Sequence, residues 1–152
     1  MAFEVESRFA SLEKLINKAN EKGLDEEQAS YLSKLGSVLV CGNIERCVEV
    51  LILNRISRNS PGQVAVFLKS YFKRGTNYDC EAICQLLHKF DSDWARRFEA
   101  TLTQEMKSSV SSCYSIRNSV AHGGGQSLGP RILKQYFDAS FDLIAALENS
   151  IK

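Results

Sequence analysis

The stretch from Arg117 to Gly125 holds the residue types that phosphate chemistry needs. Arg117, Asn118 and His122 fall within six positions, and three glycines follow them. A guanidinium binds phosphate oxygens through a forked pair of hydrogen bonds, and an imidazole exchanges a proton near neutral pH. Asn118 could orient either group or a substrate. Metal-free RNA cleavage uses such parts: a base deprotonates the 2′-hydroxyl, a cation stabilises the charged transition state, and an acid protonates the departing 5′-oxygen.

The same residues also fit the ordinary end of a helix. Gly123 would end it, His122 would interact with the helix dipole, and Arg117 and Asn118 would face solvent. On an ideal helix, Arg117 and His122 are about 140° apart, so they share a face only if the helix frays near His122. The other histidine, His88, stands beside Lys89 near the end of a predicted helix and is interpreted as a structural or surface residue. Because acid and base roles need two groups, a symmetric dimer would have to supply the second histidine.

Helices are predicted along most of the chain, because apolar residues recur at spacings of three and four. The segments are about 3–22, 26–56, from Pro61 to 73–75, a short helix from 77–79, one that opens near Trp94, about 103–122, and one from Pro130. Asp25, Ser60 and Asp91 are predicted to cap three of them. No alternating pattern with hairpin turns occurs, so we expect one all-α domain over residues 1–152, with about five to seven helices.

The charge distribution restricts where a nucleic acid could bind. A formal net charge of +1 excludes a generally basic surface, so any RNA contact must come from a local patch. Between Glu105 and Asp138 there is no carboxylate, whereas four basic residues are present: Lys107, Arg117, Arg131 and Lys134. We therefore predict that Lys107, Arg131 and Lys134 contact RNA beside the Arg117 motif.

Metals, cofactors and membranes are not indicated. The five cysteines are an odd number without paired metal-ligand spacing, and we interpret them as core residues in a reducing compartment. Residues 3–6 are acidic where a signal peptide needs a basic start, and no apolar stretch has the length of a membrane span. We expect a soluble, cytoplasmic protein that needs neither a metal nor a cofactor.

The motif from Arg117 to Gly123 resembles the R-N-x-x-x-H signature of the HEPN superfamily (higher eukaryotes and prokaryotes nucleotide-binding domains). The chain is most similar in type to the ribonuclease-associated RiboL-PSP group. The resemblance also covers the all-α layout, the chain length and Glu45 in the middle of a long early helix. It implies an antiparallel helical bundle that dimerises with its motif helices facing each other. It further implies metal-independent endoribonuclease activity, often in toxin–antitoxin or anti-phage systems.

By residue, the resemblance implies that Arg117 and His122 are the catalytic pair, with Asn118 as the intervening polar residue. Glu45 corresponds to an acidic position that can pair with the arginine, and Arg46 and Ser119 are candidate supporting residues. Glu45 and Arg46 belong to a stretch with polar and charged residues in the middle of the long early helix, Gly42-Asn43-Ile44-Glu45-Arg46, and from the sequence alone a solvated stripe on the helix surface is the favoured interpretation of it. Single-stranded or loop RNA is the expected substrate, because its bases and in-line geometry are accessible.

Two other classes of function stay open. A non-catalytic HEPN module could bind RNA, a nucleotide or a partner protein such as an antitoxin, since a fold alone does not establish catalysis. A purely structural helical dimerisation domain would leave the polar residues of the motif unexplained. The intact set of Arg117, Asn118 and His122 favours the enzyme.

Overall fold

The computed structural model describes residues 3–58, 60–72, 76–124 and 127–152. All regular structure in these ranges is helical, in seven elements: α1 (Phe3–Ala19), α2 (Glu26–Ser57), α3 (Gly62–Phe72), α4 (Cys80–His88), α5 (Ser92–Thr101), α6 (Gln104–Ala121) and α7 (Pro130–Ser150). This confirms the predicted all-α class. No helix in the described part of the chain is long and apolar enough to cross a membrane.

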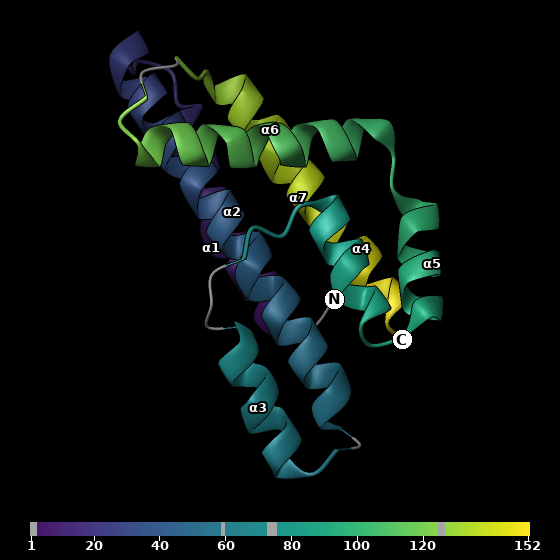
Figure 1. Ribbon diagram of the computed structural model, residues 1–152. Coiled ribbons are helices and arrows are strands. Elements are labelled where there is room, and N and C mark those ends of the chain that lie inside the picture. The colour runs from purple at the N-terminus through teal and green to yellow at the C-terminus, as the bar shows by residue number, and fades with distance from the viewer. Residues whose placement is uncertain (1–2, 59, 73–75, 125–126) are drawn as a thin grey trace.

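Two of the long helices, α2 and α7, run side by side in the same direction (Figure 1). Near their beginnings, Gly36 of α2 lies against Leu133 of α7. Near their ends, Nε of Arg55 donates a hydrogen bond of 2.6 Å to the carbonyl oxygen of Ile151. Contacts at both ends therefore fix the register of this pair.

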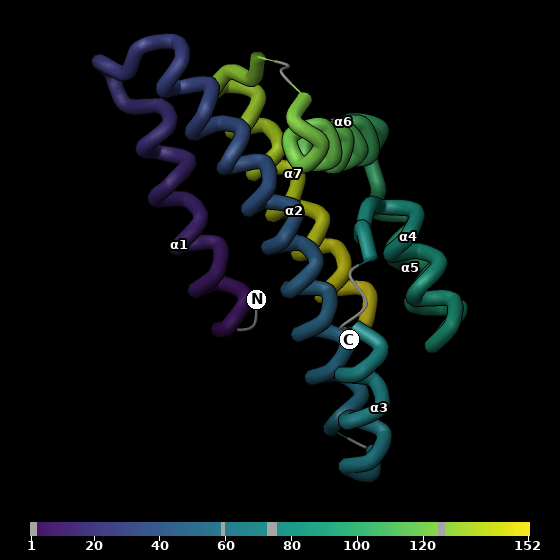
Figure 2. Tube along the Cα trace, turned by 60° about the vertical axis from the view of Figure 1, so that its left-hand side comes forward, coloured from purple at the N-terminus to yellow at the C-terminus, as the bar shows by residue number. Residues whose placement is uncertain are grey.

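Helix α1 joins them in the same layer and runs antiparallel to both (Figure 2). Its Leu15 approaches Gly36 near the start of α2, while Phe9, earlier in α1, packs edge-on against Phe137 further along α7. A Cβ atom on Gly36 would lie 2.6 Å from Cδ2 of Leu133 and 3.2 Å from Cδ2 of Leu15. Glycine at this position thus allows three helices to meet closely.

Helix α6 crosses this layer instead of extending it (Figures 1 and 2). The buried Cys113 anchors the crossing, because its Sγ lies 3.6 Å from both Cys41 Sγ and the carbonyl oxygen of Ser37 in α2. The motif is therefore carried by a helix that lies over the bundle, with α2 directly beneath it. All five cysteines are free thiols, and four are buried.

Most helix boundaries follow the local sequence. Asp25 and Asp91 cap α2 and α5 by accepting hydrogen bonds from backbone N–H groups, as predicted. The first helix ends at Ala19, three residues before the predicted boundary, and α3 begins at Gly62, one residue after Pro61. The predicted end of that helix at 73–75 lies outside the described residues.

Candidate active site

The glycines after the motif end α6 through a defined backbone turn. The helix ends at Ala121, and the exposed His122 is its C-cap, with φ −99° and ψ 16°. Gly123 has φ +75°, and its N–H donates to the carbonyl of Val120 at 3.1 Å. The N–H of Gly124 donates to the carbonyl of Ser119 at 2.7 Å, which completes a Schellman motif. His122 thus stands at the point where the chain leaves the helix.

Ser119 and Gly124 fit tightly against each other in this turn. A Cβ atom on Gly124 would lie 2.0 Å from Oγ of Ser119 and 2.8 Å from its carbonyl oxygen. Ser119 is half-buried. Its observed contacts are with the turn that follows the motif, so it supports the position of the chain around His122.

Arg117 is held by polar groups from three parts of the chain. Its side chain is 35% exposed. One terminal nitrogen donates to Oδ1 of Asn77 at 3.0 Å and to Oδ1 of Asn118 at 3.2 Å. The other lies 3.8 Å from Oε1 of Glu45 on α2. The guanidinium is therefore oriented by the fold, in contrast to an arginine that simply faces solvent.

Glu45 is a partly desolvated carboxylate. Its side chain is only 24% exposed, and Oε1 has no hydrogen-bond partner among the described residues. Burial raises the pKa of Glu45, and the attraction of Arg117 offsets this only in part. Glu45 positions the guanidinium electrostatically, yet it holds its own negative charge less readily than an exposed glutamate does.

Asn77 is a site residue that the sequence did not indicate. It comes from the segment before α4, which is attached to α6 because the backbone N–H of Tyr78 donates to Oη of Tyr114 at 3.0 Å. Both tyrosines are buried, and burial raises the pKa of Tyr114. The only sequence feature that could have indicated it is a polar residue in a short connection, two residues before the N-cap Asp79. No short-range sequence pattern links Asn77 to Arg117, which lies 40 positions later in the chain.

Arg46 pairs with carboxylates other than Glu45. Its two terminal nitrogens pair with Glu49, at 2.7 Å, and with Glu4 of α1, at 3.9 Å. Asn43 and Ile44 are buried, so the interpretation of this stretch as a solvated stripe is wrong. Although Glu45 and Arg46 are neighbours in α2, Glu45 forms an ion pair with Arg117 of α6, whereas Arg46 forms one with Glu4 of α1.

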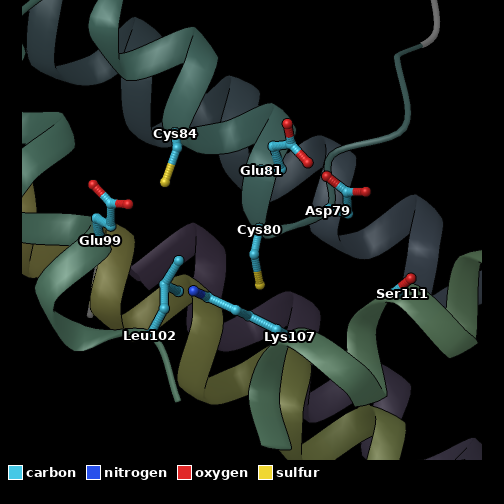
Figure 3. Close-up of a pocket in the computed structure, with 8 residues that line it drawn as sticks. All are labelled: Asp79, Cys80, Glu81, Cys84, Glu99, Leu102, Lys107 and Ser111. Carbon is cyan, nitrogen blue, oxygen red and sulfur yellow. The ribbon is translucent and has the colours of Figure 1, made fainter. Parts of the chain in front are cut away.

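The predicted RNA-binding lysines and arginine do not gather at one place. Lys107 lies near the other end of α6, in a cleft of about 460 Å³ among α4, α5 and α6 (Figure 3). Three carboxylates share that cleft: Asp79, Glu81 and Glu99. Lys134 pairs with Asp138 and lies over the ring of Phe137, while Arg131 is exposed in the first turn of α7.

The combined geometry provides an oriented cation and an exposed imidazole at one helix end. In the described residues, no group of three or more His, Cys, Asp and Glu side chains is placed to hold a metal ion. The chemistry available from these side chains is phosphate binding by Arg117 and proton transfer by His122.

Comparison with known proteins identifies the family. The sequence model of the RiboL-PSP-HEPN family, a family of HEPN domains, matches residues 4–152. No curated protein and no solved structure matches the chain. The family match extends from the second residue of α1 to the C-terminal residue and includes both Glu45 and the Arg117–His122 motif. The chain therefore belongs to the RiboL-PSP-HEPN family.

Proposed function

We propose that this protein is a metal-independent endoribonuclease that cleaves single-stranded or loop RNA in the cytoplasm. Attack of the 2′-hydroxyl on the adjacent phosphate would leave a 2′,3′-cyclic phosphate and a 5′-hydroxyl end. Membership of a HEPN family supports an RNA-related role. The observation that carries the proposal is the pre-oriented guanidinium of Arg117, five residues before a histidine exposed at the helix end.

Arg117 would stabilise the negative charge that develops on the phosphate oxygens. Its orientation by Asn77, Asn118 and Glu45 exists before substrate arrives, so little reorganisation is needed at the moment of reaction. An incoming phosphate would compete with Glu45 for the guanidinium. Because burial raises the pKa of Glu45, the carboxylate is a weaker competitor than an exposed one.

His122 would transfer the proton. It is exposed at the C-cap of α6, where its backbone N–H still donates to the carbonyl oxygen of Asn118 at 3.2 Å, so within one chain it keeps the helical position about 140° from Arg117. One motif histidine per chain supplies either the base or the acid, while the reaction uses both. We therefore place the site at a homodimer interface, with one His122 from each protomer. A toxin–antitoxin or anti-phage setting, with an antitoxin as regulator, is part of the same proposal.

The alternative is a HEPN module that binds RNA, a nucleotide or a partner protein without catalysis. One observation favours it: within a single chain, Arg117 already has hydrogen bonds to Asn77 and Asn118 and an ion pair with Glu45. If these contacts persist when RNA binds, the guanidinium serves the fold and cannot grip the reacting phosphate.

Cleavage of a mixed RNA substrate in EDTA separates these functions. Purified wild type is compared with His122→Ala and Arg117→Ala, and with His88→Ala as the matched control, because His88 is exposed on α4. We expect 2′,3′-cyclic phosphate ends from wild type and the control, and a rate lower by roughly 10²–10⁴ in His122→Ala. Equal cleavage by wild type and His122→Ala would exclude the proposed mechanism, whereas RNA binding without any cleavage would establish the alternative.

A further inference from the structure

Helix α3 carries two large apolar side chains that the described part of the chain leaves uncovered. Val66 and Phe67 are 71% and 68% exposed, although the next residue, Leu68, is buried. Helix α3 packs against the last part of α2, and this pair projects beyond the other helices (Figure 1). Single exposed apolar residues are common, so the surroundings of these two decide whether they have a role.

Phe67 belongs to a short aromatic column that has a cation beside it. Tyr71 lies four residues later, on the same side of α3 and one turn closer to its end. Nζ of Lys89, at the end of α4, lies 5.8 Å from the centre of the Tyr71 ring and donates a hydrogen bond of 3.3 Å to the tyrosine hydroxyl oxygen. Tyr71 is half-buried. The column therefore offers one exposed ring, at Phe67, and one cation, at Tyr71.

No carboxylate of the same segment offsets the positive charge near this column. Residues 50–78 contain five Lys and Arg and no Asp or Glu. Lys89 is exposed, and no ion pair joins it to a carboxylate in the described residues. The surface thus differs from the cleft at Lys107, which three carboxylates share. An unpaired cation beside aromatic rings favours an anionic partner that also offers flat apolar groups.

The end of α3 stands next to the segment that orients Arg117. The ring of Phe72, the last residue of α3, lies 6.3 Å from the ring of Tyr78, centre to centre. The backbone of Tyr78 is bound to α6, and Asn77, the residue before it, accepts the hydrogen bond from Arg117. Phe67 is five residues before Phe72, or roughly 8 Å along the helix. A strand bound at Arg117 could therefore continue past Asn77 onto α3.

We propose that the exposed side of α3 is a docking site for single-stranded RNA, with a base stacked on Phe67 and a phosphate bound by Lys89. Such a site tolerates any sequence, because every base has a flat π face and a lysine holds the backbone without reading bases. An acidic protein or an anionic lipid surface would also meet the cation, but only a strand that reaches Arg117 uses the continuity between α3 and Asn77. The inference rests on the proposed function for the use of the bound strand, which the site leads to Arg117.

Equilibrium binding of a single-stranded RNA of about 12 nucleotides tests the site without any cleavage. Fluorescence anisotropy gives the dissociation constant in a His122→Ala parent, in which the RNA stays intact. We expect Phe67→Ala to weaken binding by roughly 5- to 150-fold, through the loss of one stacked base. The matched control is Phe3→Ala, an 84% exposed phenylalanine on α1, which should bind as the parent does. Equal dissociation constants for Phe67→Ala and its parent overturn the inference and leave the proposed function standing.

A conservative substitution keeps the test valid if alanine at position 67 disturbs the fold. Phe67→Trp retains a ring that can stack, so it should preserve RNA binding, and RNA should quench its indole emission. Trp94, the single natural tryptophan, is half-buried on α5, and its signal in the parent is subtracted. Phe3→Trp should show no quenching. Tight RNA binding without quenching in Phe67→Trp contradicts stacking at this position.

The salt dependence of binding tests the cation. Lys89→Ala should reduce the log–log slope by about 0.7, the value for one phosphate of a single strand. Lys69→Ala is the matched control, because Lys69 is exposed on α3 but lies about 160° around the helix from Phe67, so its slope should change less. Equal slopes for Lys89→Ala and its parent contradict a phosphate contact at Lys89.

Substrate length separates this inference from the proposed function. In chains that keep His122, Phe67→Ala should raise KM for the long strand at unchanged kcat and should not alter cleavage of a dinucleotide, which spans only roughly 7 Å when stacked. Equal losses with both substrates overturn the inference. RNA binding that depends on Phe67 in a protein that cleaves neither substrate would keep the α3 site and reject the proposed function. Binding to phosphatidylserine vesicles that Phe67→Ala abolishes, without RNA binding, would assign α3 to a lipid surface and overturn the inference.

Discussion

The two ends of α6 each hold a basic side chain near carboxylates, but their surroundings differ. Lys107 shares an open cleft with Asp79, Glu81 and Glu99. Arg117 faces one carboxylate, Glu45, together with two neutral amides. The cleft therefore has an excess of negative charge, which disfavours RNA, whereas at the motif end one cation faces a single carboxylate. We therefore expect phosphate to bind a basic side chain of this chain only where the fold brings few carboxylates to it.

The pKa shifts agree with this difference. Burial raises the pKa of Cys80, in the cleft, to about 11, and the Asp79 carboxylate adds to that rise, while Lys107 opposes it only in part. At the motif end, burial is what raises the pKa of Glu45, and Arg117 acts against it. Burial is the largest cause of the pKa shift in both places, but the first-named neighbouring charge adds to it in the cleft and opposes it at the motif end.

The largest expected effect comes from exchanging the two kinds of cation. Arg117→Lys removes the fork that binds two phosphate oxygens, and we expect RNA cleavage to fall by about 10²-fold or more. Lys107→Arg keeps a cation among three carboxylates and should cause at most a small change. Initial cleavage rates at saturating RNA measure both. Comparable losses in the two variants would mean that the ends of α6 are not functionally distinct.

The turn that presents His122 can be broken without touching the charged groups. Gly124→Ala would force a Cβ atom into Ser119, and we expect the free energy of unfolding to fall by roughly 1–3 kcal/mol. Gly62→Ala is the control, because the space at the start of α3 is open and alanine reduces the entropy of the unfolded chain there. Urea denaturation measures both. A stable Gly124→Ala variant would show that this turn is not tightly constrained.

Titration sharpens the role of Glu45. Its pKa in the folded protein is raised above the ordinary value of 4.5, so its protonated form is favoured by folding. The protonated carboxyl group therefore adds to the free energy of unfolding at low pH, and this added stability is lost as the pH rises through the raised pKa. Relative to Glu45→Gln, wild type should therefore lose stability as pH increases, with a slope of at most about 1.4 kcal/mol per pH unit. Parallel stability curves from urea denaturation at pH 4 to 7 would contradict the shift.

The smallest effect concerns the start of α7. In a His122→Ala background, Arg131→Ala should reduce the salt dependence of RNA binding by about 0.7 in the log–log slope, as expected for one lost phosphate contact with a single strand. Lys134→Ala should change it less, because its ammonium group already pairs with Asp138. Fluorescence anisotropy at several salt concentrations measures the slopes. Identical slopes for wild type and Arg131→Ala would remove Arg131 from the RNA path.

Helix ends were predictable because their causes are local. Asp25 and Asp91 cap helices through N–H groups two or three residues away, and glycine at 123 adopts the backbone conformation that ends α6. The pairing of Glu45 with Arg117, carried over from the family resemblance, is confirmed at 3.8 Å. These features could be predicted because they depend on residue type, on contacts between residues close in sequence, or on a motif shared with a known family.

The surroundings of the site were not predictable in the same way. Asn77 reaches Arg117 because Tyr78 binds Tyr114 across two segments, which is a result of packing that no periodicity encodes. The absence of carboxylates between Glu105 and Asp138 suggested a basic surface around Lys107. In three dimensions α4 and α5, the two helices that directly precede α6, pack beside Lys107 and supply the acids that its own stretch lacks.

The close meeting of three helices at Gly36 has a consequence for how related sequences can vary. Any side chain at position 36 would collide with Leu133, so the two positions cannot drift independently. A relative with alanine at 36 should carry a smaller residue at 133, or at 15, to keep α1, α2 and α7 in register. Paired substitution of these sites would therefore record, within the family, that the same three-helix junction has been inherited.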